Sequence, residues 1–264
     1  MARLLIFGGG RMGGAVVGGL VRAGWADRDQ LVVVERRQEA REAIAARYPA
    51  VEVVEAPGRA DGVVLAVKPG DLEAACRALP RQEVGRLLSI AAGATLARLE
   101  GWLWPGLPVV RAMPNMPALV GAGASVIAPG TAAAEEDLAW AESVLSSIGV
   151  VVRLPERLLD AATGLSGSGP AYVFLVVEAL VEAGVLEGLD REVARVLAVQ
   201  TLLGAARMLD ETGERAEELR AAVTSPGGTT AAGLRALEGR AVRSAFLEAV
   251  AAAAERARQL GREH

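Results

Sequence analysis

The sequence feature that most constrains the fold is a glycine-rich loop at residues 8–13, Gly-Gly-Gly-Arg-Met-Gly. It directly follows the apolar run 3–7, and apolar residues recur at helical spacing over 11–23. In a strand–turn–helix unit of this kind, the first glycine permits a tight turn and the second lets the backbone approach a pyrophosphate. The third allows helix and strand to pack closely, and the helix N-terminus favours the anion. The loop therefore predicts a dinucleotide site, the alternative being a structural glycine turn. The three glycines of the motif are Gly8, Gly10 and Gly13.

Strand and helix patterns alternate through the first 155 residues. Repeated β-α-β units of this kind predict a parallel sheet with helices on both faces. After the first strand at 3–7 and the first helix at 11–23, further strands are expected at 31–34, 51–54, 62–67, 87–90, 109–111, 124–128 and 150–154. Helices are expected at 38–47, 71–79 and 134–147.

Beyond Pro155, Ala, Leu, Glu and Arg predominate and recur at helical spacing. The sequence thus predicts an α/β Rossmann-type dinucleotide-binding domain, 1–155, followed by an all-α domain, 156–264. In the second domain we expect helices at 171–183, 190–209, 216–223, 230–237 and 242–260.

The helix expected at 171–183 is apolar on nearly every side, with Gly184 as its stop signal. Such a helix has to be buried all round. An α-domain of about this length does not easily surround it alone, so we expect a homo-oligomer in which a second subunit packs against it. A monomeric core is the alternative.

The composition excludes several classes of protein. The net charge is −4 and there is no basic stripe, so we expect no nucleic-acid partner. The single cysteine, Cys76, rules out an internal disulfide and a cysteine-built metal site, and we expect no metal. Gly, Pro or charged residues interrupt each apolar stretch before membrane-span length, and no signal-peptide pattern is present. We therefore expect a cytoplasmic protein without a membrane partner.

The end of the second expected strand leaves the choice of coenzyme open. Glu35 lies where an acidic residue would bind a ribose 2′-hydroxyl, which favours NAD. Arg36 and Arg37 follow directly and could clamp a 2′-phosphate, which favours NADP. An ordinary solvated loop is the remaining alternative.

Three further strand ends carry candidate coenzyme contacts, because ligands bind beyond the carboxyl ends of parallel strands. Lys68 is the only lysine among 28 Lys and Arg residues, and the proline after it favours an extended backbone. The small residues 89–93 would let a flat ring or ribose approach, or would simply pack. Asn115 could hydrogen-bond a carboxamide, the alternative being a structural turn.

The segment 224–230, Thr-Ser-Pro-Gly-Gly-Thr-Thr, is a second glycine loop set between helical patterns. Successive backbone amides in a glycine turn form a nest that binds anions, and the hydroxyl groups add donors. We interpret this loop as a site for a small anion. By contrast, Ser168 is more simply a helix N-cap.

No side chain offers itself as a general acid. The only histidine is the terminal His264, and neither Tyr48 nor Tyr172 has a lysine four residues later. Hydride transfer to a ketone leaves an alkoxide that requires a proton donor, whereas water can protonate an imine beforehand. The sequence therefore favours a small imine substrate bearing a carboxylate.

Five motifs resemble those of pyrroline-5-carboxylate reductases in order and spacing, over essentially the whole chain. The last two are specific to that family, whereas the first two also occur in other Rossmann enzymes. The motifs are Gly8-x-Gly10-x-Met12-Gly13, Ala66-Val67-Lys68-Pro69, Arg111-x-Met113-Pro114-Asn115-x-Pro117, Gly167-Ser168-Gly169-Pro170-Ala171-Tyr172 and Val223-Thr224-Ser225-Pro226-Gly227-Gly228-Thr229-Thr230.

The resemblance implies reduction of the cyclic imine Δ1-pyrroline-5-carboxylate to L-proline with NADPH or NADH, the last step of proline biosynthesis. It implies a homodimer formed by the helical domain, often assembled as a decamer. It also implies that Thr230 bonds the ring nitrogen through its hydroxyl, and that Ser225, Gly228 and Thr229 hold the substrate carboxylate through backbone amides. The implied coenzyme contacts are Phe7, Gly8, Gly9, Gly10, Arg11, Met12, Ala66, Val67, Lys68, Pro69, Ala92 and Gly93.

Two other interpretations remain open. A β-hydroxyacid dehydrogenase has a similar two-domain architecture, but it would need a catalytic lysine in the helical half, which contains none. A non-catalytic dinucleotide-sensing protein is the alternative from another class.

Overall fold

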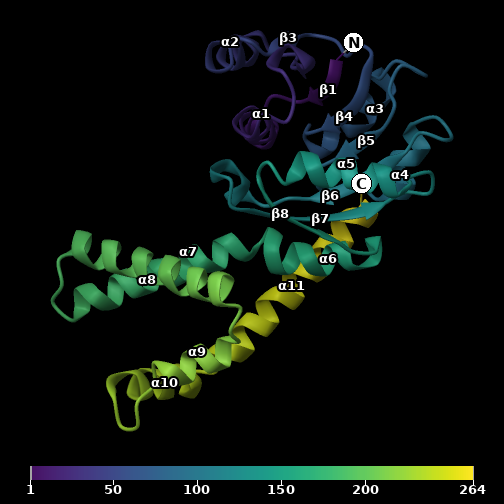
Figure 1. Cartoon of the computed structure of the whole chain (residues 1–264). Helices are drawn as coiled ribbons and strands as arrows, with labels where there is room; N and C mark the ends of the chain where they lie inside the picture. Colours follow the sequence, from purple (N-terminus) through teal and green to yellow (C-terminus); the bar gives the residue numbers. More distant parts are fainter. Residues whose placement is uncertain (1, 264) are drawn as a thin grey trace. The chain divides into compact units, whose positions relative to one another are not determined.

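The structure, a computed structural model, describes residues 2–263, except for the side chains of Ala2, Arg28 and Glu263. His264 lies outside the described residues. The chain forms two compact units (Figure 1). Unit 1 comprises the chain up to Ser168 together with the segment from Ala252 onward, and unit 2 comprises Gly169–Ala251.

Unit 1 is built on one eight-stranded sheet with the strand order β3-β2-β1-β4-β5-β6-β7-β8. Its first six positions follow the order of a doubly wound dinucleotide-binding sheet. The strands are β1 (Ala2–Phe7), β2 (Leu31–Val34), β3 (Glu52–Val54), β4 (Ala60–Leu65), β5 (Leu87–Ser89), β6 (Val109–Met113), β7 (Gly123–Pro129) and β8 (Gly149–Arg153).

The sheet is parallel with one exception, because β7 runs antiparallel to β6. An all-parallel sheet was expected, so this pair corrects the prediction. The connection between the two strands contains only the short 3₁₀ helix η3 (Met116–Val120). A parallel crossover needs a dozen or more residues, and this connection is too short to provide one.

Helices cover both faces of the sheet, as the alternating pattern predicts. Side chains of α1 (Arg11–Ala23) and α5 (Glu135–Leu145) bury one face. Side chains of α3 (Leu72–Ala78) and α4 (Leu96–Trp102) bury the other, together with Leu159 of α6 (Leu159–Ala162). The remaining helix, α2, spans Gln38–Arg47.

The sequence patterns predicted α1 and α2 to the residue but missed α4. Thr95 is the N-cap of α4, and its hydroxyl accepts a hydrogen bond from the Arg98 N–H at 3.4 Å. The helix has only seven residues, too few for a helical period to stand out. Only its position in the fold, where Leu96 and Leu99 pack under the sheet, makes it recognisable.

Unit 2 consists of helices. These are α7 (Gly169–Leu186), α8 (Arg191–Thr212), α9 (Ala216–Ala222), α10 (Thr229–Gly239) and α11 (Val242–Glu263), whose last residues belong to unit 1. Asp190 caps α8 as predicted, and its carboxylate accepts the Glu192 N–H at 2.8 Å. Gly184 does not end α7, which continues for two further residues. A side chain at Gly184 would come within 3.0 Å of the Ala194 methyl group, so this glycine allows α8 to approach α7 closely.

Most apolar side chains of unit 2 are exposed in the single chain. Among its described residues, the buried apolar side chains are Val181, Ala194 and Ala198. On α7, Phe174 and Leu175 remain 51% and 64% exposed. The prediction that this helix is buried all round therefore fails for one chain alone.

The stretch Glu156–Leu186 is long and apolar enough to cross a membrane, and an 18-residue window within it has a mean hydropathy of 1.7. The expectation that Gly, Pro or charged residues interrupt every apolar stretch before this length is therefore wrong. Here α6 leads directly into the π-helical turn Thr163–Gly167, and only the bend at Ser168 separates this turn from α7. One such stretch is weak evidence of a membrane span, because a helix that packs against other protein has the same length and composition.

The division between the units falls at Ser168, later than the domain boundary expected at 155. The reason lies in α6, because Leu159 is fully buried in the core of unit 1.

Candidate functional site

A cavity of about 330 Å³ opens where β1 and β4 end. These neighbouring strands are the point at which the strand order of the sheet reverses, and ligands of such folds bind there. Phe7 and Gly8 line the cavity from the end of β1, and Ala66, Val67 and Lys68 from the end of β4. The structure thus brings two of the predicted motifs to one place.

The glycine loop has the geometry that its sequence predicts. Gly8 adopts φ +110°, and a side chain there would come within 2.7 Å of the Ala66 carbonyl oxygen. Gly13 lies against the Gly8 carbonyl, so that any side chain would overlap it. Gly10 is the N-cap of α1 and has open space around its α-carbon, as the approach of a ligand requires.

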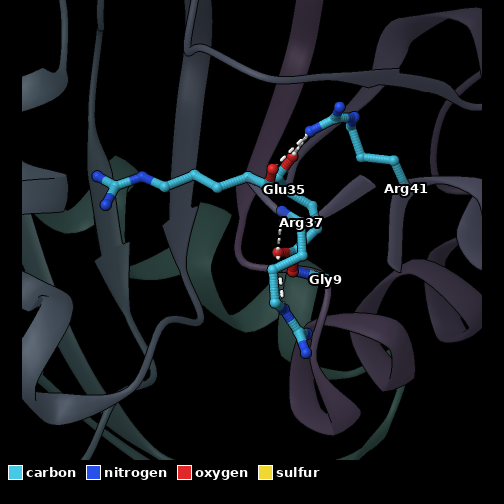
Figure 2. Close-up of polar contacts among 5 residues, drawn as sticks. Gly9, Glu35, Arg37 and Arg41 are labelled. Carbon is cyan, nitrogen blue, oxygen red and sulfur yellow. Dashed lines mark hydrogen bonds and ion pairs between the residues drawn. The ribbon is translucent and has the colours of Figure 1, made fainter. Parts of the chain in front are cut away.

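Glu35 is the first residue of the β2–α2 turn, and its side chain reaches the glycine loop (Figure 2). Its side chain is buried, and its carboxylate accepts hydrogen bonds from the Gly9 N–H at 3.1 Å and the Arg37 N–H at 3.0 Å. Burial alone would raise the pKa of this carboxyl, but hydrogen bonds from Arg37 and Gly9 lower it below the usual value. Glu35 is therefore ionised at neutral pH.

The cavity is rich in positive charge near Glu35. Arg36, Arg37 and Lys68 line it, and Arg36 and Lys68 have no ion-pair partner within residues 2–263. The Arg37 guanidinium is 3.3 Å from the Glu35 carboxylate but remains largely exposed. As the proline after it predicts, Lys68 has an extended backbone. The cavity can therefore receive a phosphorylated ligand.

Some predicted contacts lie beside the cavity rather than in it. Gly9 and Arg11 line a neighbouring hollow of about 340 Å³ between α1 and α2. Pro69 and Gly93 line a smaller one of about 140 Å³. Met12 packs partly against the core. Ala92 is exposed and lines none of these hollows.

Asn115 has the structural role that the sequence left as an alternative. Its side-chain amide donates to the Ser166 carbonyl at 2.9 Å, and its side-chain oxygen accepts from the Ala124 N–H at 2.8 Å. It thereby ties the start of β7 to the π-helical turn. This use of both ends of the amide favours the structural interpretation over a coenzyme contact.

Four cavity residues were absent from the predicted contacts: Val34, Arg37, Asp71 and Ala75. Arg37 had been considered only as part of the basic pair after β2. Asp71 and Ala75 lie at the start of the α3 region, directly after β4. The rule that ligands bind beyond strand ends could have indicated them, because the next helix begins there.

In unit 2 the loop 224–230 leads into the N-terminus of α10. Gly227 adopts φ +71°, and Gly228 is the N-cap, its N–H donating to the Ser225 carbonyl at 3.1 Å. The Ser225 hydroxyl lies over the Gly228 α-carbon so closely that a side chain at 228 would overlap it. The first N–H groups of α10 carry its positive dipole end, which favours an anion.

The hydroxyl groups of this loop divide into two sets. Thr224 donates to the Arg220 carbonyl at 2.5 Å and so completes the end of α9. Within residues 2–263, the hydroxyls of Ser225, Thr229 and Thr230 have no hydrogen-bond partner. These three hydroxyl groups are available to a ligand, whereas the Gly228 N–H already donates to the Ser225 carbonyl within the loop.

The described residues contain no group of three or more His, Cys, Asp or Glu side chains that could hold a metal ion. Cys76, the one thiol, is buried.

Two family models match this chain. The model described as "Pyrroline-5-carboxylate reductase dimerisation" matches residues 156–260. The model described as "NADP oxidoreductase coenzyme F420-dependent" matches residues 3–93.

Similar proteins cover nearly the full length. The chain is 44% identical to the pyrroline-5-carboxylate reductase of Mycobacterium tuberculosis, over 98% of this chain and 97% of that protein. It is 41% identical to that of Methanosarcina acetivorans, over 97% of each. The structure of the Coxiella burnetii pyrroline-5-carboxylate reductase matches with a TM-score of 0.92 and 36% identity, covering 98% of both chains. The Plasmodium falciparum pyrroline carboxylate reductase, solved with NADP bound, matches with a TM-score of 0.85 and 29% identity over 98% of both.

Proposed function

The chain belongs to the pyrroline-5-carboxylate reductase family, and we propose which of its residues carry out the reaction. It reduces the cyclic imine Δ1-pyrroline-5-carboxylate to proline with NAD(P)H. The observation that carries the residue assignment is the pair of glycine loops. One borders a basic cavity in unit 1, and the other presents free donors at the N-terminus of α10 in unit 2.

The coenzyme fits the cavity of unit 1, because the open space at Gly10 and the N-terminus of α1 suit a pyrophosphate. When bound there, NAD(P)H supplies a hydride, with its electron pair, for the carbon of the C=N bond. In our proposal Gly8, Gly10 and Arg11 hold the pyrophosphate. Arg36 and Arg37 are placed for a 2′-phosphate, and Ala66–Pro69 with Ala92 and Gly93 border the nicotinamide side.

The substrate carboxylate is held by the loop of unit 2. The backbone amides of Ser225, Gly228 and Thr229 surround the turn, and the dipole of α10 adds to their attraction for a negative charge. A carboxylate fixed in this way also fixes the ring that bears it. Orientation of the imine is therefore the main contribution of this loop to the rate.

Thr230 is the hydroxyl that we assign to the ring nitrogen. It lies in the first turn of α10 and has no hydrogen-bond partner within the described residues. The nitrogen can take its proton from water before hydride transfer, so Thr230 needs only to orient it. Substitution by alanine should lower kcat/KM by about tenfold to a few hundredfold, the effect of one or two hydrogen bonds in the site.

The experiment is to measure coenzyme oxidation with Δ1-pyrroline-5-carboxylate for the wild type, Thr230→Ala and Thr230→Val. Oxidation that depends on the imine supports the function, and its absence contradicts it. Because no titrating side chain is proposed, a higher pH should not rescue either variant. Thr224→Ala is the matched control, because that hydroxyl already bonds the Arg220 carbonyl. Near-wild-type turnover in both Thr230 variants would remove Thr230 from the mechanism.

The match of residues 156–260 to a dimerisation domain supports a homodimer. We further propose that 156–264 is the functional helical domain, that dimers assemble as a decamer, and that the enzyme works in the cytoplasm. Light scattering coupled to size exclusion, on untagged protein, tests the decamer.

A further inference from the structure

Glu35 occupies the position at which an acidic residue would bind the coenzyme ribose, but its carboxylate already has partners. One oxygen accepts the Gly9 N–H at 3.1 Å, and the other accepts both the N–H and Nε of Arg37, at 3.0 and 3.3 Å. The residue is 8% exposed. A carboxylate offers about four acceptor positions, and three of these are taken.

Gly9 is held from two sides. A side chain at this position would overlap the Ile44 side chain of α2 and would come within 3.3 Å of the Glu35 carboxylate. Gly9 also lies between Gly8 and Gly10, the two glycines that border the coenzyme cavity. Any shift of Gly9 therefore moves the backbone on which the pyrophosphate is expected to rest.

The β2–α2 turn that carries Glu35 is itself fixed. The Arg41 guanidinium donates to the carbonyl oxygens of Glu35 at 3.1 Å and Arg36 at 2.6 Å (Figure 2). Hydrogen bonds thus run from α2, through Glu35, to the glycine loop. Hydrogen bonds to a charged carboxylate are stronger than those between neutral groups, so this connection is suited to holding the loop.

The charges in the cavity are distributed unequally. The Glu35 charge is compensated by Arg37, whereas Arg36 has no carboxylate partner in the described part of the chain. A 2′-phosphate entering the cavity thus meets a free guanidinium and a carboxylate that is already paired. The acidic residue therefore does not exclude the phosphorylated coenzyme.

We propose that Glu35 is a positioning residue, which fixes the glycine loop for both coenzymes through Gly9, and that Arg36 sets the preference for NADPH over NADH. This inference rests on the coenzyme site of the proposed function. It differs from the usual role of an acid at this position, which is to bind the ribose hydroxyl and disfavour the 2′-phosphate.

The test measures the dissociation constants of NADPH and NADH by coenzyme fluorescence without imine substrate. The amide nitrogen of glutamine donates and does not accept, so Glu35→Gln loses one of the two backbone N–H bonds and should weaken both coenzymes by about tenfold. Glu35→Asp keeps the charge, but the aspartate side chain is too short to reach both the Gly9 and the Arg37 N–H groups. This variant should therefore also weaken the binding of both coenzymes. Arg36→Ala should weaken NADPH by about tenfold and NADH by less than twofold. Glu42→Gln, which removes an exposed acid of α2, is the control and should change neither.

A second readout is hydrogen exchange of the coenzyme-free protein. Glu35→Gln and Glu35→Asp should speed exchange in the peptide that contains residues 8–13, and Glu42→Gln should not. Tighter NADPH binding together with weaker NADH binding in Glu35→Gln would overturn the proposal, because that pattern belongs to a residue that binds the ribose. Unchanged exchange at the loop would overturn it as well. Both measurements omit the imine, so failure of the proposed reaction is a separate result.

Discussion

The two units of this chain differ in how their apolar side chains are covered. The central strands of the sheet in unit 1 are buried on both faces, and residues such as Leu88 and Leu99 are fully inaccessible, whereas Val150 and Val152 of the edge strand β8 are exposed. In unit 2 the paired helices α7 and α8 enclose only a small cluster and leave large apolar side chains exposed. The difference teaches that one chain completes its coenzyme domain alone but completes its helical domain only as a dimer.

The strongest test of this contrast places a charge on the exposed apolar surface of unit 2. Leu175→Glu should weaken the dimer more than a hundredfold and abolish activity, because an unpaired charge buried at an interface costs several kcal/mol. Sedimentation velocity over a dilution series measures the effect. Ala46→Glu adds the same charge to an exposed position on α2 of unit 1 and is the control. A Leu175→Glu dimer as tight as the wild type would contradict the comparison.

A pair of matched truncations tests the two kinds of core. Leu88→Ala, in β5, should lower the free energy of unfolding by about 2–5 kcal/mol through loss of burial and the cavity left behind. Leu197→Ala, at a side chain 54% exposed in the single chain, should lower stability less. The stability lost through Leu197→Ala should also increase as the protein is diluted, if the partner subunit covers this side chain in the dimer. Urea unfolding at several protein concentrations distinguishes the two, and equal losses independent of concentration would refute the contrast.

A further prediction, confined to alkaline pH, concerns Cys76, a thiol in unit 1. Burial raises its pKa from 9.0 to about 12. Because the folded pKa lies above the unfolded one, the stabilisation is present below pH 9.0 and is lost as pH rises toward about 12, by roughly 1.4 kcal/mol per pH unit. Unfolding free energies of the wild type and Cys76→Ala should therefore diverge above pH 9.0.

The reactivity of the same thiol shows whether the core of unit 1 remains folded when the dimer dissociates. Alkylation of Cys76 by iodoacetamide should remain slow on dilution and become fast only in denaturing urea. Fast alkylation at protein concentrations that merely separate the subunits would show that unit 1 depends on its partner.

Local patterns predicted much of the fold because they reflect local physics. The helical period and the Asp190 cap are properties of neighbouring residues, and α1, α2 and the start of α8 followed from them. The glycine loop was predictable for the same reason, since three closely spaced glycines have few other uses after a strand.

Local patterns do not settle the features that distant residues decide. Asn115 resembles a ligand contact until its bonds to Ala124 and Ser166 are seen, and Gly184 resembles a helix stop until α8 packs against it. Antiparallel β7 depends on the length of a connection rather than on the pattern of the strand itself.

By itself the sequence determined the order of elements, the two glycine loops and the chemical character of each. Only the tertiary structure decided what Glu35 does, because its partner Gly9 lies 26 residues away along the chain. A carboxylate that looks free to bind a ribose is held by the loop itself. The physical reason is that a buried charge is stable only where hydrogen bonds satisfy it, and the fold, not the local sequence, brings those donors to Glu35.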